Sequence, residues 1–225
     1  MKKAICLISG GLDSSVAAYI AKNKAYDIYA LSFNYGQRHE KEVKCAKKIA
    51  DSLNAKKHII FEIDLAKFGG SSLVDKKKQI RQVKDIEEIG KKIPSTYVPA
   101  RNTIFLSIAL AYAEIENAQA IYIGATSTDY SGYPDCRPEY FKAYQKLSNI
   151  ATKKTIEGGT IKIKTPLLDL SKAEIIKEGI KLNVPFQNTW SCYQGGKKAC
   201  GHCDSCLLRL KGFKEADIVD PIEYE

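Results

Sequence analysis

A stretch of seven residues near the N-terminus, Ser9–Ser15, has the composition of an anion-binding loop. It lies between an apolar segment expected to form a strand and a segment with helical spacing, which is where open α/β sheets bind phosphates. Gly10 and Gly11 allow a tight turn, while the serine hydroxyls and the free amides of the helix favour negative charge. Asp13 is placed to hold Mg²⁺ against a phosphate. A glycine turn with Asp13 as a simple N-cap is the alternative.

Two better-known phosphate loops are excluded. The Walker pattern GxxxxGK[ST] lacks its lysine, and the GxGxxG fingerprint is absent. What remains, SGGxDS after an apolar strand, resembles the PP-loop of ATP pyrophosphatases. The resemblance implies that ATP is split between its α and β phosphates, that AMP passes to a substrate oxygen, and that Asp13 is catalytic. The expected ATP contacts form one continuous stretch, namely Ile8, Ser9, Gly10, Gly11, Leu12, Asp13, Ser14, Ser15, Val16, Ala17 and Ala18.

Four of the seven cysteines, Cys192, Cys200, Cys203 and Cys206, fall within fifteen residues. In a cytosolic protein such a cluster favours a metal over disulfides. Four thiolates match a closed tetrahedral zinc site with no open position, so the predicted zinc is structural. An iron–sulfur cluster on the same ligands is the alternative. His202 lies within the cluster, but a four-cysteine site needs no fifth ligand.

The elements that position these residues alternate along the chain. Strands are expected at 4–8, 28–35, 57–63, 120–125 and 160–167, and helices at 13–22, 40–53, 101–117, 138–151 and 171–182, with Ser171 as the last N-cap. This alternation predicts an α/β fold with a doubly wound, mostly parallel five-stranded sheet. Residues 1–189 are expected to form the catalytic domain, and residues 190–225 a small C-terminal metal-bound module. The long segment 65–96 is expected to be a functional or mobile loop.

Composition sets the outer limits on function. The chain has 225 residues, of which 44% are hydrophobic, and carries 35 basic against 26 acidic side chains, giving a net charge of +9. A basic balance favours phosphates of any kind, but the lysines are scattered, so charge alone does not predict RNA binding. No apolar run approaches the roughly 20 residues that cross a bilayer, and the apolar start meets two glycines and is not a signal peptide. We therefore expect a cytoplasmic protein.

Several longer segments together resemble one family, 7-cyano-7-deazaguanine synthase. They are SGGLDSS (9–15), FNYGQRHEKE (33–42), PSTYVPARNTIFLS (94–107), TDYSGYPDCRPEYF (128–141), TPLLDLSKAEII (165–176) and TWSCYQGG…CGHCDSCLLRLKGF (189–213). The resemblance covers nearly the whole chain and implies that 7-carboxy-7-deazaguanine, ammonia and ATP are the substrates. It also implies a nitrile product reached through adenylated carboxylate and amide intermediates, and a homodimer. No nucleic-acid or membrane partner is expected.

Further residue roles are predicted outside the loop Ser9–Ser15. Arg101, which begins a helix, is expected to be catalytic by stabilising developing phosphoryl charge, with a surface salt bridge as the alternative. Arg38, His39 and Asn102 are further candidates for nucleotide or substrate contacts. Cys136 is read as a buried small side chain, because an acyl-adenylate route needs no thiol nucleophile. The predicted substrate contacts are Asp129, Tyr130, Tyr133, Asp135, Arg137 and Trp190; core packing is the alternative for Trp190.

Three other functions share part of this pattern. A PP-loop enzyme that thiolates or otherwise modifies tRNA would fit the positive charge and the cysteine cluster. Against it, the metal would use all four clustered cysteines, and no separate RNA-binding domain is expected. An ammonia-using amide ligase would share the loop but not the segment 128–141. A non-catalytic nucleotide-binding regulator would bind ATP without releasing AMP or pyrophosphate.

Overall fold

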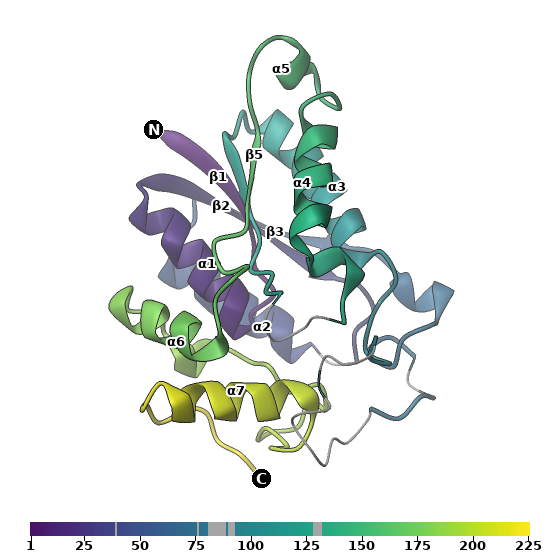
Figure 1. The fold of residues 1–225 in the computed structure, drawn as a ribbon, viewed down its shortest axis with the longest axis vertical. Coiled ribbons are helices and arrows are strands. Elements are labelled where there is room, and N and C mark those ends of the chain that lie inside the picture. The colour runs from purple at the N-terminus through teal and green to yellow at the C-terminus, as the bar shows by residue number, and fades with distance from the viewer. Residues whose placement is uncertain (39, 76, 81–88, 90–92, 128–131) are drawn as a thin grey trace.

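A five-stranded parallel sheet forms the centre of the molecule (Figure 1). The computed structural model describes residues 1–225 except 39, 76, 81–88, 90–92 and 128–131. The strands are β1 (Lys2–Leu7), β2 (Tyr26–Asn34), β3 (Lys57–Glu62), β4 (Ala120–Tyr122) and β5 (Lys162–Lys164), in the order β3-β2-β1-β4-β5. Each neighbouring pair is parallel. The predicted fold class is confirmed, and the strand order reverses between β1 and β4, which is where open sheets bind ligands.

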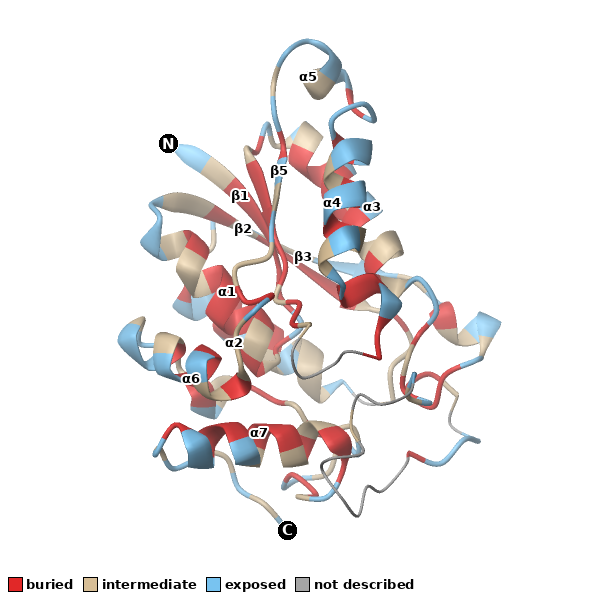
Figure 2. Ribbon diagram, in the orientation of Figure 1, coloured by how far each residue is buried: buried red, intermediate tan, exposed pale blue. Residues whose placement is uncertain are grey.

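Helices cover both faces of the sheet because alternate residues of a strand point to opposite sides. Ala4 and Cys6 of β1 pack against α1 (Leu12–Asn23) and α2 (Lys41–Ser52). Ile5 and Leu7 pack instead against α3 (Arg101–Ile115) and α4 (Pro138–Ser148). The central strands are accordingly buried on both sides, as Figure 2 shows in red.

Two further helices form an outer layer on α1. Helix α6 (Lys172–Lys181) packs on α1 and on α7 (Asp204–Glu215), with Phe186 and Phe213 among the buried residues between them (Figure 1). The predicted cap of α6 is confirmed: Ser171 accepts a hydrogen bond from the Glu174 amide, and Glu174 bonds back to the Ser171 backbone. This reciprocal cap fixes where α6 begins and therefore where Lys172 lies.

Several predicted boundaries are wrong in detail. The strands expected at 120–125 and 160–167 are short, and the helix expected at 138–151 ends at Ser148. A separate turn of helix, α5 (Lys153–Ile156), follows because the Thr152 side chain accepts a hydrogen bond from the Thr155 amide. Single turns of 3-10 helix lie at η1 (Leu65–Phe68), η3 (Pro134–Cys136) and η4 (Phe186–Asn188). Within the described residues, no helix is both long and apolar enough to cross a membrane.

Candidate active site

The loop between β1 and α1 presents an open helix N-terminus. Gly11 is the N-cap of α1 and no side chain caps the helix, so the amides of its first turn point out of the loop. Gly10 has a φ of +82°, and a Cβ there would lie 2.2 Å from the Glu42 carbonyl oxygen. Glycine is therefore required by both conformation and space. The N-cap alternative for Asp13 is wrong, because Asp13 lies in the first helical turn.

The serine hydroxyls hold the shape of this loop. Ser14 Oγ accepts a hydrogen bond from the Ser9 amide at 3.1 Å, and Ser9 Oγ accepts one from the Gly11 amide at 3.2 Å. Ser15 Oγ donates to the Gly11 carbonyl at 2.7 Å. These bonds preorganise the backbone amides, which is the main requirement for binding an anion without reorganisation.

Asp13 has a partner that the sequence did not suggest. Its Oδ1 atom lies 2.7 Å from Nζ of Lys172, the first residue of α6, and the lysine side chain is only 8% exposed. The lysine stem runs against Gly212 of α7, where an added Cβ would lie 2.3 Å from Lys172 Cγ. The close α6–α7 contact therefore fixes the lysine under the loop, and the pair leaves the second oxygen of Asp13 for another ligand.

A cavity of about 250 Å³ opens at the carboxyl ends of β1, β2 and β4. It is lined by many of the predicted site residues: Ile8, Ser9, Gly11, Leu12, Asp13, Ser14, Arg101, Asn102, Tyr133, Cys136 and Trp190. The C-terminal part of the predicted ATP stretch lies on the buried side of α1, namely Ser15, Val16, Ala17 and Ala18. Of these, Val16 and Ala17 pack toward α6 and α7. The structure thus gathers one end of the predicted ATP stretch at the cavity and places the other end in the core.

Arg101 lines this cavity at the start of α3. Burial lowers its pKa, but Tyr35 and Tyr133 outweigh that effect and hold the pKa above its ordinary value, so the guanidinium stays charged. No carboxylate of the described residues pairs with it, and its guanidinium lies 6.0 Å from the Phe105 ring centroid. The preceding Ala100 has a φ of +54°, a conformation that is uncommon for residues other than glycine. The alternative for Arg101, a surface salt bridge, is therefore not seen among the described residues, and Arg101 lines the cavity.

Glu42 also lines the cavity, and our sequence analysis gave it no role. It lies in the first turn of α2. Burial raises the pKa of its carboxyl to about 7, although Arg101 acts in the opposite direction and Cys192 adds a smaller increase. A glutamate at a helix start usually reads as a surface residue that complements the helix dipole, so its sequence position carried no signal.

Asp135 and Cys136 lie in η3 and contact the start of α3. Asp135 Oδ2 accepts a hydrogen bond from the backbone amide of Asn102 at 3.1 Å. The side-chain amide of Asn102 donates to the Asp135 carbonyl and to Cys136 Sγ. Burial raises the pKa of the Cys136 thiol to about 11. Cys136 is a buried side chain rather than an ionised nucleophile.

The other predicted contacts are distributed differently. Tyr133 is buried, and its hydroxyl lies 3.0 Å from Thr96 Oγ1. Arg137 is exposed at the N-cap of α4. Arg38 donates hydrogen bonds to the carbonyls of Ser72, Asp75 and Lys78, and so holds part of the segment 65–96. Asp129, Tyr130 and His39 lie outside the described residues.

Trp190 joins the phosphate loop to the cysteine cluster. Its backbone amide donates to the Gly10 carbonyl at 2.8 Å, and its indole Nε1 donates to the Cys192 carbonyl at 2.9 Å. Lys41 Nζ lies 3.2 Å from the indole ring centroid and also donates to the carbonyls of Gly196 and Lys197. Displacement of the cluster would therefore be transmitted to Gly10.

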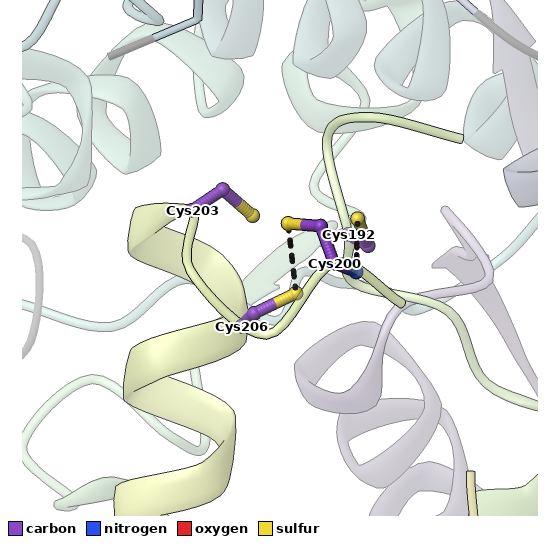
Figure 3. A group of neighbouring side chains, drawn as sticks. All are labelled: Cys192, Cys200, Cys203 and Cys206. Atoms are coloured by element: carbon purple, nitrogen blue, oxygen red, sulfur yellow. Dashed lines mark hydrogen bonds between the residues drawn. The ribbon is translucent and has the colours of Figure 1, made fainter. Parts of the chain in front are cut away.

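The four clustered cysteines form a candidate metal centre. Cys203 and Cys206 come from the start of α7, while Cys192 and Cys200 come from the preceding loop (Figure 3). All four are buried, and their sulfur atoms lie within 4.8 Å of one another. A tetrahedral site with Zn–S bonds of about 2.3 Å needs sulfurs about 3.8 Å apart, and Cys200 and Cys206 Sγ lie 3.9 Å apart. Hydrogen bonds from Cys203 and Cys206 lower the pKa of Cys192. This donor set could hold a metal ion.

A buried ion pair stabilises the loop that carries Trp190 and Cys192. Arg209 of α7 is 2% exposed, and its guanidinium lies 2.7 Å from Asp220. It also donates to Thr189 Oγ1 at 2.8 Å and to the Phe186 carbonyl. Asp220 in turn accepts a hydrogen bond from the Tyr224 hydroxyl at 2.6 Å. Arg209 also donates to Ser191 Oγ at 3.4 Å, so the network contacts the chain on both sides of Trp190.

Comparison with known proteins agrees with this arrangement. Residues 3–217 match a family model described as "Queuosine biosynthesis protein QueC". The 7-cyano-7-deazaguanine synthase of Coxiella burnetii (strain RSA 331 / Henzerling II) is 54% identical over 228 residues, covering 100% of this chain and 98% of that protein. The synthase of Picrophilus torridus is 55% identical over 227 residues, covering 100% of this chain and 92% of that one. That of Trichodesmium erythraeum is 52% identical over 220 residues, covering 98% and 99% respectively.

The match begins in β1 and extends beyond the end of α7, so it includes the phosphate loop, the cavity and the cysteine cluster in one alignment. Relatives of similar length align from end to end with more than half of their residues identical. This chain therefore belongs to the QueC family of queuosine biosynthesis proteins.

Proposed function

We propose that this chain is an ATP-dependent synthase that converts 7-carboxy-7-deazaguanine and ammonia to 7-cyano-7-deazaguanine in queuosine or archaeosine biosynthesis. One observation carries the proposal: curated relatives 51–55% identical over nearly their whole length bear that synthase name. The uncapped N-terminus of α1 at the cavity supports binding of a nucleoside triphosphate.

Adenylation answers the chemical difficulty of this reaction. Ammonia does not displace oxygen from a carboxylate, because the carbon is shielded by negative charge and oxide is not a leaving group. If the carboxylate attacks the α phosphorus of ATP, pyrophosphate departs and AMP becomes the leaving group. Ammonia then forms the C–N bond as AMP departs, which gives the amide. A second adenylation, on the amide oxygen, allows that oxygen to leave with AMP as the nitrile forms and two N–H protons are lost.

The described residues suit these steps. The amides of the first turn of α1 and the loop Ser9–Ser15 would bind the phosphates. Arg101, charged and without a carboxylate partner among the described residues, would stabilise the charge that develops on the transferred phosphoryl group. Tyr133 and Trp190 line the cavity beside it and are proposed contacts of the deazapurine. Asp129, Tyr130, Asp135 and Arg137 remain proposed substrate contacts from the sequence.

Two metal ions complete the proposal. The Asp13 oxygen that Lys172 does not bind is an oxygen ligand of the kind Mg²⁺ prefers, and Mg²⁺ there would neutralise charge on the phosphates. The four buried cysteines would hold one structural zinc ion, since every position of a tetrahedral site is supplied by the chain.

Residues 190–225 are proposed to be an appended module on a catalytic domain of residues 1–189. The module contacts the loop Ser9–Ser15 through the Trp190 amide, which donates to the Gly10 carbonyl. It contacts α2 through the Trp190 ring, which lies beside Lys41. We also propose a cytoplasmic homodimer without a nucleic-acid or membrane partner. The exposed Ile60 and Phe61 on edge strand β3 support association of two copies.

A single reaction mixture tests the activity. Purified protein is incubated with ATP, Mg²⁺, ammonium and 7-carboxy-7-deazaguanine, and the nitrile is sought by mass spectrometry alongside AMP and pyrophosphate. The Asp13→Asn variant, of nearly the same size, gives the background. We expect nitrile without added tRNA. Turnover only when tRNA is present would indicate a tRNA-modifying enzyme, and ATP binding without AMP or pyrophosphate release would indicate a regulator.

A further inference from the structure

Among the residues that the structure describes, the Glu42 carboxylate in the candidate active site has no hydrogen-bond or ion-pair partner. Two carboxylate side chains, Asp13 and Glu42, contribute to the described lining of the cavity. Asp13 is held by Lys172 at 2.7 Å, whereas no described residue donates a hydrogen bond or an ion pair to the Glu42 carboxylate. The adjacent Lys41 does not neutralise it, because its ammonium group contacts Trp190 and the carbonyls of Gly196 and Lys197.

The groups that face Glu42 come from three other elements. Arg101 comes from the start of α3, Tyr35 follows β2, and Cys192 belongs to the cysteine loop. A half-buried carboxylate without a partner is costly to keep, and such groups concentrate at functional sites. Its position at a cavity suggests a ligand that donates hydrogen bonds or carries positive charge.

We propose that Glu42 is the residue that binds the ammonium ion and accepts its proton, an inference that rests on the proposed function. The carboxylate pairs with the cation and takes one proton, which frees the nitrogen lone pair. The nitrogen attacks the adenylated carbon, the C–N bond forms, and the C–O bond to AMP breaks with its electron pair leaving on the phosphate. The proton that the nitrogen loses as the amide forms passes to the departing phosphate.

Arg101 explains why this site suits ammonium rather than the donor edge of the base. We place Arg101 at the transferred phosphoryl group, so a carboxylate beside it lies at the reacting end of the substrate. The paired N–H groups of the base that a carboxylate binds through both of its oxygens belong to the six-membered ring, whereas the reacting carboxylate is carried by the five-membered ring. The positive charge of Arg101 also lowers the pKa of an ammonium ion bound beside Glu42, which promotes loss of its proton.

The test compares nucleophiles in Glu42→Gln, with Glu40→Gln as the matched control. Glu40 precedes α2, is 81% exposed and pairs only with Lys44 among the described residues. Ammonium is varied at saturating ATP and 7-carboxy-7-deazaguanine, and hydroxylamine, which is uncharged at neutral pH, is used in parallel. We expect the Gln variant to lose about 100-fold in kcat/KM for ammonium and to stay within a few fold of wild type with hydroxylamine. Glu42→Asp should recover part of the ammonium activity.

A second measurement separates this inference from the proposed function. Exchange of labelled pyrophosphate into ATP reports adenylation without any ammonia, and it should be equal in wild type, Glu42→Gln and Glu40→Gln. Absence of exchange in wild type would refute the proposed function itself. Loss of exchange in Glu42→Gln alone, a raised KM for the carboxylate substrate, or equal losses with ammonium and hydroxylamine would overturn the ammonium site. If Glu42→Gln does not fold, ammonium saturation of Glu42→Asp identical to wild type would overturn it.

Discussion

Gly124 follows β4 and packs against the loop between β1 and α1. Replacing Gly124 by alanine should push β4 and this loop apart. A Cβ at this position would lie 2.6 Å from both the Asp13 carbonyl carbon and the Ser14 amide nitrogen, and 2.7 Å from the Asp13 carbonyl oxygen. All three are backbone atoms, so no side chain can rotate away. Either β4 or the first turn of α1 must move.

The size of the effect follows from these distances. Ordinary contact begins at 3.4 Å, so the methyl group requires a shift of about 0.8 Å. Forcing a methyl group into a packed site typically costs about 1–3 kcal/mol of stability. A displacement of about 1 Å in a positioning element can lower a rate by roughly 100-fold. We therefore expect Gly124→Ala to fold, with reduced stability and with kcat lowered between about 10-fold and 100-fold.

Urea unfolding and pyrophosphate release measure these two quantities. Gly158→Ala is the control: Gly158 has a φ of +89°, so alanine is strained there, but no atom lies within 4 Å of the added Cβ. It should lose about 1–2 kcal/mol with kcat unchanged. If Gly124→Ala kept wild-type kcat, or if both variants lost activity in proportion to stability, the argument from loop displacement would be refuted.

Three further changes test other parts of the structure. Arg209→Met should lower the free energy of unfolding by about 3–5 kcal/mol in urea titration, because Asp220 is left buried without its cation. Cys203→Ser should reduce the metal content measured by mass spectrometry to near zero and remove most of the protein from the soluble fraction. Lys172→Met should raise the KM for ATP at fixed Mg²⁺ by about tenfold or more, since Asp13 loses the partner that orients it.

Exposed lysines provide the controls for these variants. Lys211→Met removes only a surface pair with Glu215 at 3.7 Å and should cost less than about 1 kcal/mol. Lys177→Met, on the exposed side of α6, should leave the KM for ATP unchanged. Equal destabilisation by Arg209→Met and Lys211→Met would contradict the buried network. Wild-type metal content in Cys203→Ser would argue against a four-cysteine site, and an unaltered KM in Lys172→Met against the role assigned to that lysine.

Local sequence determined the parts of the site whose chemistry is contiguous in the chain. The loop Ser9–Ser15 encodes its own turn, because glycine conformations and serine-to-backbone hydrogen bonds act over a few residues. The cysteine spacing likewise brings its ligands together on one loop and the first turn of α7. Alternating apolar strands and amphipathic helices were enough to predict a parallel sheet. The ends of the strands could not be predicted in this way. Strand β4 ends at Tyr122, two residues before Gly124, which packs against the backbone of Asp13 and Ser14.

Tertiary structure decided which charged side chains became buried, paired with a distant residue or placed at the cavity. Nothing near Lys172, Glu42 or Arg209 in the chain distinguishes these residues from the many solvated charges of this basic protein. Lys172 reaches Asp13, 159 positions away, because Gly212 lets α6 and α7 pack around its stem. Burial and partner choice depend on how distant elements pack, and the free energy of a charge depends on both. The sequence therefore specified the loop Ser9–Ser15 and the candidate metal ligands, while packing alone determined the electrostatics of the cavity.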